Sequence, residues 1–144
     1  LKNPHARGYI IDVKTKRHVT FRAPLNPYGH IFDAKAEFLY LSSFQKGRLY
    51  KISTKTGKIV KTVPNNPGTF NFGFSPSERY LYSFHKRGVI VFSTATLKPI
   101  QHYPLATLFP GKRVLVSVEF YQIFRSGYMA LRNKETVKIF KLLE

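Results

Sequence analysis

The chain has 144 residues, the size of one ordinary domain, and 43% of them are hydrophobic, which is enough to bury a core and excludes a disordered chain. It carries 24 Lys and Arg against 7 Asp and Glu, a formal net charge of +17 at pH 7. The lack of cysteine excludes disulfides and thiolate chemistry. No run of 18 apolar residues predicts a helix that spans a membrane.

Short strands separated by Gly, Pro and Ser turns are predicted along the whole chain. They group into a half unit at about 8–24, two full units at about 29–63 and 69–103, and a last unit at about 114–141. The half unit holds strands near 8–13 and 18–22, and the last unit holds strands near 114–120, 128–132 and 136–141. We expect no helix except one short turn in the segment 105–112.

One complete unit, residues 66–104, illustrates the pattern. Phe70, Phe72 and Phe74 alternate along its first strand, and we expect most of the strand aromatics, with Tyr80, Tyr82, Phe84 and Phe92, to form the hydrophobic core between neighbouring units. The segment 75–79 (SPSER) is a turn, so Ser75 is expected to have a role in the turn and not that of a nucleophile.

The units repeat with a period of about 40 residues, which is typical of propeller blades. The segment 48–64 matches 88–104, and the segment 8–24 has the same order of strand, turn and strand. A sandwich or a barrel also contains regularly spaced short strands. Four strands in each period favour blades.

The segments FSPSERYLYSF (residues 74–84) and STKTGKIVKTVP (residues 53–64) resemble the YVTN-type and WD-repeat families of β-propellers. The resemblance implies an all-β fold with blades of four antiparallel strands, about three and a quarter blades in this chain. There is no Trp, so the Trp-Asp dipeptide of WD repeats is absent. The Asp that ends the third strand in these families is Asp12 in the first unit but Ser53 and Ser93 in the next two. The YVTN-type label therefore fits better.

A propeller ring typically has 4–8 blades, and the predicted strands supply fewer. The chain starts at Leu1 in the middle of a unit and stops after the third strand of another. We therefore expect the C-terminal half of a larger propeller, completed by another polypeptide. The alternative is completion by a second copy of this chain.

Cations recur in the turns between the second and third strands, called B–C turns. In a propeller these turns share one face with the connections between blades, called D–A connections. The candidates for binding RNA or an acidic protein surface are Lys46, Arg48, Lys86, Arg87, Arg132 and Lys134 in B–C turns, and Lys112 and Arg113 in a D–A connection. Cations in the other turns, and each of these taken singly, are also explained as solubilising surface charge.

Three aromatic rings near these loops, Tyr28, Phe44 and His85, are candidates for stacking on bases. The acids and histidines show no spacing typical of acid–base catalysis or of metal binding, and no Gly-rich phosphate loop is present. We therefore expect no catalytic, metal or cofactor site, and a chain that is not an enzyme.

The sequence favours a scaffold function within a larger, RNA-containing assembly. The basic loops would contact the RNA phosphates or acidic neighbours in that assembly. An intracellular particle fits this charge, and an organellar one fits it too. One alternative is a protein–protein interaction module for an acidic partner. The other is half of a propeller enzyme whose active-site residues lie on the missing half.

Overall fold

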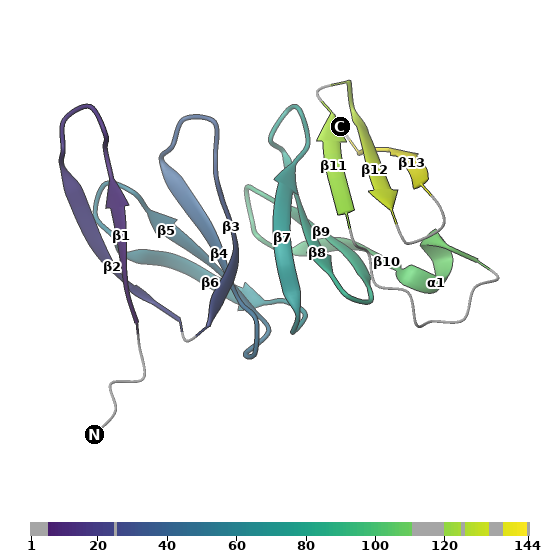
Figure 1. Ribbon diagram of the computed structural model, residues 1–144, viewed down its shortest axis with the longest axis horizontal. Coiled ribbons are helices and arrows are strands. Elements are labelled where there is room, and N and C mark those ends of the chain that lie inside the picture. The colour runs from purple at the N-terminus through teal and green to yellow at the C-terminus, as the bar shows by residue number, and fades with distance from the viewer. Residues whose placement is uncertain (1–5, 25, 111–119, 125, 133–136, 144) are drawn as a thin grey trace. The chain divides into compact units, whose positions relative to one another are not determined.

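The structure is a computed structural model that describes residues 6–24, 26–110, 120–124, 126–132 and 137–143 (Figure 1). The chain divides into two compact units, Leu1–Thr69 and Phe70–Glu144. In the first unit, β1 (Ala6–Ile11) pairs with β2 (His18–Ala23) as an antiparallel hairpin. The strands β3 (Pro27–Phe32), β4 (Phe38–Ser43), β5 (Arg48–Ser53) and β6 (Ile59–Pro64) form one sheet in that order.

The second unit contains the other two sheets. The first has four strands in the order β10-β9-β8-β7: β7 (Thr69–Phe74, which starts at the boundary), β8 (Tyr80–His85), β9 (Gly88–Ser93) and β10 (Pro99–Pro104). A helical turn, α1 (Leu105–Leu108), follows. The last sheet joins β11 (Phe120–Phe124), β12 (Tyr128–Arg132) and β13 (Val137–Lys141).

The predicted fold class is confirmed, because strands hold most of the described residues, the one helix there is a four-residue turn, and two of the sheets are antiparallel with four strands each. The short turn expected in the segment 105–112 is the helix α1, which begins directly after Pro104. Nearly all of the strand that we predicted near 114–120 lies outside the described residues, and β11 occupies 120–124.

The A–B turns, between the first and second strands, are closed by side chains at equivalent positions. The Phe38 N–H donates to Asp33 Oδ1 at 3.0 Å, and the Tyr80 N–H donates to Ser75 Oγ at 3.2 Å. A short acceptor at the start of the turn holds the N–H of the next strand. The predicted turn role of Ser75 is confirmed.

The C–D turns, between the third and fourth strands, repeat as well. Three of them are each closed by an equivalent backbone hydrogen bond, from the N–H of the first residue to the carbonyl oxygen of the residue five positions later. The N···O distances are 2.8 Å for Asp12 and Arg17, 3.0 Å for Ser53 and Lys58, and 3.0 Å for Ser93 and Lys98. The hydroxyl of Thr54 donates to Ala36 O at 2.6 Å, and that of Thr94 to Glu78 O at 2.7 Å. These bonds join the C–D turn to the A–B turn in each four-stranded sheet. The B–C turn therefore lies at the other end.

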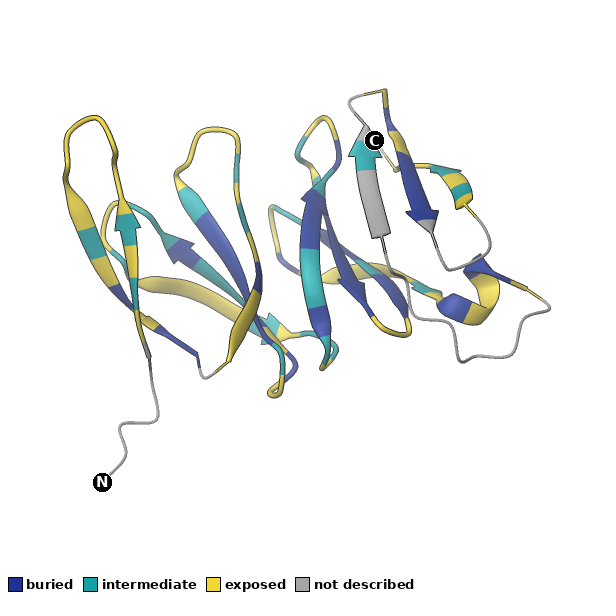
Figure 2. Cartoon of the chain, viewed as in Figure 1, coloured by how far each residue is buried: buried dark blue, intermediate teal, exposed yellow. Residues whose placement is uncertain are grey.

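Each unit has its own hydrophobic core. In the first unit it is formed by Phe21, Ala23, Leu39, Leu41 and Ile52. In the second it includes Tyr82, Phe84, Val89, Val91, Leu108 and Leu131. Figure 2 shows the burial along the strands: β4, β8 and β9 are mostly buried, whereas β6 and β10 are mostly exposed. Of the aromatics expected in the core, Phe72, Tyr82, Phe84 and Phe92 are buried, and Phe70, Phe74 and Tyr80 are half-buried.

Candidate functional site

The B–C turn of the first unit joins β4 to β5 through four residues, because Ser43 pairs with Arg48. The turn is tied to the D–A connection that follows β6. The Asn65 N–H donates to Gly47 O at 2.8 Å, and the Gly68 N–H donates to Phe44 O at 2.8 Å. Gly47 has φ +56°, and a Cβ there would lie 2.7 Å from Asn65 O. The two hydrogen bonds, and the close approach that only glycine permits at position 47, therefore hold the backbone of this turn against the D–A connection.

Lys46 and Arg48 are exposed at this turn, and an aromatic pair lies beside them. The rings of Tyr28 and Phe44 have centroids 5.3 Å apart and planes inclined at 55°. Tyr28 is 61% exposed, and Phe44 is half-buried. The Phe44 N–H donates to Asn26 O at 3.2 Å, which holds the start of the turn close to the residues before β3. An accessible ring therefore lies at the same end of the sheet as two cations.

The B–C turn of the second unit is shorter, because His85 pairs with Gly88 and only Lys86 and Arg87 lie between them. Both cations are exposed. The Leu105 N–H donates to Arg87 O at 2.6 Å, so this turn too is tied to the segment that follows its fourth strand. Gly88 has φ +148°, and a Cβ there would meet the carbonyl oxygen of Tyr103.

His85 anchors this shorter turn from inside. It is 1% exposed, and its Nδ1 accepts a hydrogen bond from the Arg87 N–H at 3.2 Å. Burial, followed by the nearby charges of His102 and Arg87, lowers the pKa of His85 to about 4. The ring is therefore neutral at pH 7. The hypothesis that His85 stacks on a base is wrong, because the ring is inside the fold.

The predicted cations have different outcomes. Lys46 and Arg48 come together in one turn, and Lys86 and Arg87 in another. Lys112, Arg113 and Lys134 lie outside the described residues. Arg132 ends β12, and its side chain is likewise not described.

Sequence reasoning missed the partner of His85, which is His102. Their ring centroids are 5.6 Å apart, although the residues lie on β8 and β10, the two strands that flank β9. The sequence carried no signal for this contact, because it depends on the strand register, in which His102 pairs with Ile90 and His85 pairs with Gly88. A shift of one residue would have placed the two rings on opposite faces.

The described part of the chain contains neither a metal-binding cluster nor a membrane-spanning helix. No three His, Cys, Asp or Glu side chains gather there as a metal site. No helix in the described residues is long and apolar enough to cross a membrane.

The chain is similar to several solved structures. Hydrazine synthase of Kuenenia stuttgartiensis matches with a TM-score of 0.75, 10% identity and coverage of 92% of this chain and 39% of that one. Dihydro-heme d1 dehydrogenase NirN in complex with DHE matches with a TM-score of 0.74 and 14% identity, over 94% of this chain and 33% of that one. The β-propeller domain of Myceliophteria thermophila Cps50 (Swd1) matches with a TM-score of 0.65 and 18% identity, over 94% and 50%.

These structures have propeller-type folds, so the propeller part of the predicted resemblance is confirmed. They do not single out the YVTN-type or the WD-repeat family. The chain spans between a third and a half of the length of the structures just named. No protein-family model matches the chain, and a search of curated proteins also gave no match.

One prediction is corrected by these similarities. We expected the chain not to belong to an enzyme, but hydrazine synthase and the dehydrogenase NirN are both enzymes. The prediction is wrong because a propeller carries its active site on a few loops. A stretch of blades without a catalytic motif therefore does not exclude an enzyme. At these identities the likeness shows the fold alone and assigns no reaction to this chain.

Proposed function

We propose that this chain is part of a β-propeller that binds single-stranded RNA through its B–C turns and helps to hold a larger, RNA-containing assembly together. The observation that carries the proposal is the exposed Tyr28 ring, packed on Phe44 in the same turn as Lys46. Proteins that bind single strands combine cations for the phosphates with aromatic rings for the bases.

The charges supply the attraction. The net charge of +17 favours any polyanion, and it draws RNA toward the protein without selecting a site. Lys46 and Arg48 in one turn, and Lys86 and Arg87 in the other, place exposed cations on backbones that hydrogen bonds hold in place. Phosphate contacts of this kind position a strand, and each adds to the salt dependence of binding.

The aromatic pair favours RNA over an acidic protein partner. Carboxylates on a partner would engage the cations equally well, but they offer no flat ring to stack on Tyr28. Unpaired bases do, and RNA is usually recognised where its bases are unstacked. The exposed Tyr28 ring is therefore better explained by unpaired bases than by the carboxylates of an acidic partner.

The ring that contains these blades is proposed to be completed by residues beyond this chain. The similar structures are two to three times as long as the part that the chain matches. A propeller protects its strand edges by closing on itself. Another polypeptide is the proposed source of the remaining blades. Light scattering of the isolated chain tests this: a monomer that melts cooperatively on its own would contradict it.

The binding experiment compares three probes for the full chain: a short single-stranded oligoribonucleotide, the matching duplex, and polyglutamate. The expected order of affinity is single strand, duplex, polyglutamate. Affinity for the single strand should fall steeply as salt rises from about 50 to 200 mM. Equal affinity for RNA and polyglutamate would favour the acidic-partner module. Binding of RNA that does not change with salt would overturn the proposal.

A second candidate is a segment of a propeller enzyme, which the similarity to hydrazine synthase and to the dehydrogenase NirN favours. The catalytic groups would then lie on the blades that complete the ring. The test is to purify the native assembly and remove this chain under mild conditions. An activity that disappears with the chain and returns when it is added back would support this candidate.

A further inference from the structure

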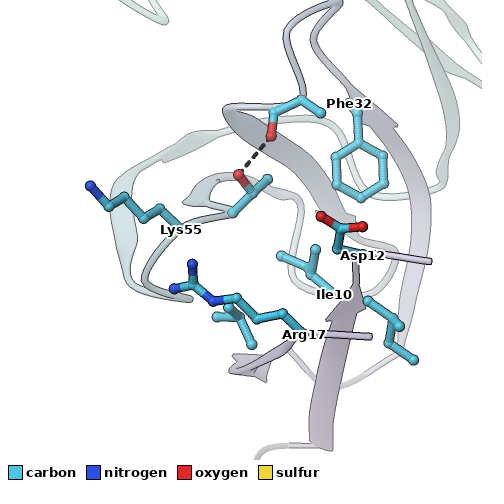
Figure 3. Close-up of a pocket in the computed structure, with 9 residues that line it drawn as sticks. Ile10, Asp12, Arg17, Phe32 and Lys55 are labelled. Carbon is cyan, nitrogen blue, oxygen red and sulfur yellow. Dashed lines mark hydrogen bonds between the residues drawn. The ribbon is translucent and has the colours of Figure 1, made fainter. Parts of the chain in front are cut away.

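A second feature lies in the first unit at the opposite end of the sheet from the B–C turn. The hairpin β1–β2 and the turns after β3 and β5 enclose a cleft of about 430 Å³ (Figure 3). This volume is in the range of sites for small molecules, which run from about 300 to 1,000 Å³. The cleft belongs to the A–B and C–D turns and shares no residue with the cations proposed to bind RNA.

The walls of the cleft are largely apolar. Ile10 and Ile11 at the end of β1 and Val19 on β2 face it from the hairpin, and Phe32 faces it from the end of β3. Ile11 is 62% exposed and Phe32 is 43% exposed, so part of this apolar surface contacts solvent in the free chain. A flat apolar group bound here would remove that surface from water.

Two cations line the cleft from different turns, Arg17 from the turn before β2 and Lys55 from the turn after β5. Figure 3 shows both side chains on one side of the cleft, with the Phe32 ring on the other. The Thr54 hydroxyl beside Lys55 is already used, since it donates to Ala36 O at 2.6 Å and to Glu37 O at 3.0 Å. The groups that remain to bind a ligand's charge are therefore cationic.

Asp12 is the acid in the cleft, and it is committed to the hairpin turn. Its Oδ1 accepts hydrogen bonds from the N–H groups of Lys14 at 2.9 Å and Thr15 at 3.1 Å. These bonds, more than the charge of Arg17, lower the pKa of Asp12. The carboxylate is thus stabilised by the turn, and the two cations in the cleft outnumber it.

We propose that this cleft binds a small organic anion with a flat apolar body, such as an aromatic carboxylate or sulfonate. The body would lie between Ile11 and Phe32, and the anionic group would contact Arg17 and Lys55. A guanidinium binds a carboxylate through two parallel hydrogen bonds, which fixes the direction of the ligand. This site is independent of the RNA proposal, because it lies at the other end of the blade.

The lack of tryptophan in the chain provides a direct probe. The variant Phe32→Trp places a single indole at the cleft, and the ligand is the anionic dye anilinonaphthalenesulfonate. Energy transfer from the indole to the dye reports dye bound in the neighbourhood of the cleft, and the variants described next assign that binding to the cleft. We expect a saturable signal with one site in the full 144-residue chain. The neutral analogue phenylnaphthylamine should bind about tenfold more weakly, because it makes no bond to a cation.

The controls separate this site from the general attraction of a basic protein. In the Phe32→Trp background, Arg17→Gln or Lys55→Gln should weaken dye binding by about tenfold. Lys14→Gln and Lys58→Gln remove the same charge from the same two turns without lining the cleft, so they should change it by less than about twofold. Ile11→Ser should weaken the binding of both dyes, because it removes apolar surface from the lining of the cleft.

Two results would overturn the proposal. One is equal binding of the anionic and the neutral dye, which would mean that the cations take no part. The other is an equal loss of binding in the Lys14→Gln and Arg17→Gln variants, which would mean that net charge alone attracts the dye.

Discussion

The turn between β4 and β5 and the turn between β8 and β9 join corresponding strands of the two four-stranded sheets. The first is a four-residue loop with an aromatic pair beside its cations, the exposed Tyr28 and the half-buried Phe44. The second is a two-residue hairpin that carries Lys86 and Arg87 over a buried His85. Both turns present cations, but only the first adds an accessible ring.

This difference separates two contributions to binding. The shorter turn offers charge on a rigid hairpin, which suits phosphates and makes no distinction among bases. The longer turn offers charge together with a stacking surface, which suits unpaired bases. We therefore expect the first unit to account for the preference for single strands, and both units to account for the salt dependence.

The largest effect is expected at the glycine of the shorter turn. The variant Gly88→Ala should destabilise the chain by about 3 kcal/mol, because its φ of +148° is rarely adopted by other residues and the new Cβ meets the Tyr103 carbonyl oxygen. Gly47→Ala should cost less, about 1–2 kcal/mol, since its φ of +56° lies in the left-handed helical region. Urea unfolding measures both. The account of the two turns is wrong if Gly47→Ala is the more damaging change.

The next effect concerns the ring that only the longer turn presents. The variant Tyr28→Ala should weaken binding of single-stranded RNA by about tenfold or more, because stacking contributes about 1–3 kcal/mol per base. Binding of heparin, a polyanion without bases, should stay the same. Phe32→Ala is the matched control, since Phe32 is an exposed ring at the other end of the same strand, β3. Equal losses for RNA and heparin would show that Tyr28 supports the fold and does not stack on bases.

The shorter turn should give the chain a dependence on pH. The pKa of His85 is lowered from 6.5 to about 4, so the unfolded chain binds a proton at a pH where the folded chain does not. Stability is therefore fully present above about pH 6.5 and falls between pH 6.5 and 4. Melting temperature should drop by roughly 5 °C over that range.

His85→Gln removes the titrating group and serves as the control for this pH effect. Its melting temperature should depend less on pH over the same window. The charge of His102 is one cause of the low pKa of His85, so His102→Gln should raise that pKa. The pH range over which stability falls should then become narrower. If the melting temperature of His85→Gln depended on pH as strongly as that of the wild type, the pH effect would belong to other groups.

The smallest effect lies at the opposite end of the sheets. Ser75→Ala removes the oxygen that accepts the Tyr80 N–H, and it should cost about 1 kcal/mol. Asp33→Ala should cost a similar amount in the first unit, by loss of the bond from the Phe38 N–H. Neither variant should change RNA affinity at a temperature where the chain is folded. A loss of RNA binding in either variant would place the RNA interface at the A–B turns and would contradict the proposal that the B–C turns bind RNA.

Local patterns in the sequence predicted the strands and most turns. The alternation of Phe70, Phe72 and Phe74, and the Ser and Pro residues after them, depends on neighbours in sequence. Such signals can be recognised without a structure. The exposure of Lys46 and Lys86 could be predicted for the same reason, since short turns between strands lie at the surface.

The differences between the two B–C turns could not be predicted. QKGR and HKRG are similar in sequence, but Ser43 pairs with Arg48 while His85 pairs with Gly88, and pairing register depends on the whole sheet. The burial of His85 and the ring contact of Tyr28 with Phe44 likewise result from contacts between segments distant in sequence. The cleft at the other end of the sheet could not be predicted either, because it forms only where the turns after β1, β3 and β5 come together in space.

The central claim is that the B–C turns, and not the net charge alone, bind RNA. The direct test compares two variants that lose the same charge. One changes Lys46, Arg48, Lys86 and Arg87 to Gln, and the other changes Lys14, Lys16, Lys58 and Lys98, all exposed in C–D turns. The measurement is the slope of the logarithm of RNA affinity against the logarithm of salt concentration. The first variant should flatten the slope by about 3, since each phosphate contact with a single strand contributes about 0.7, and the second should leave it nearly unchanged. Equal flattening in both variants would contradict the claim.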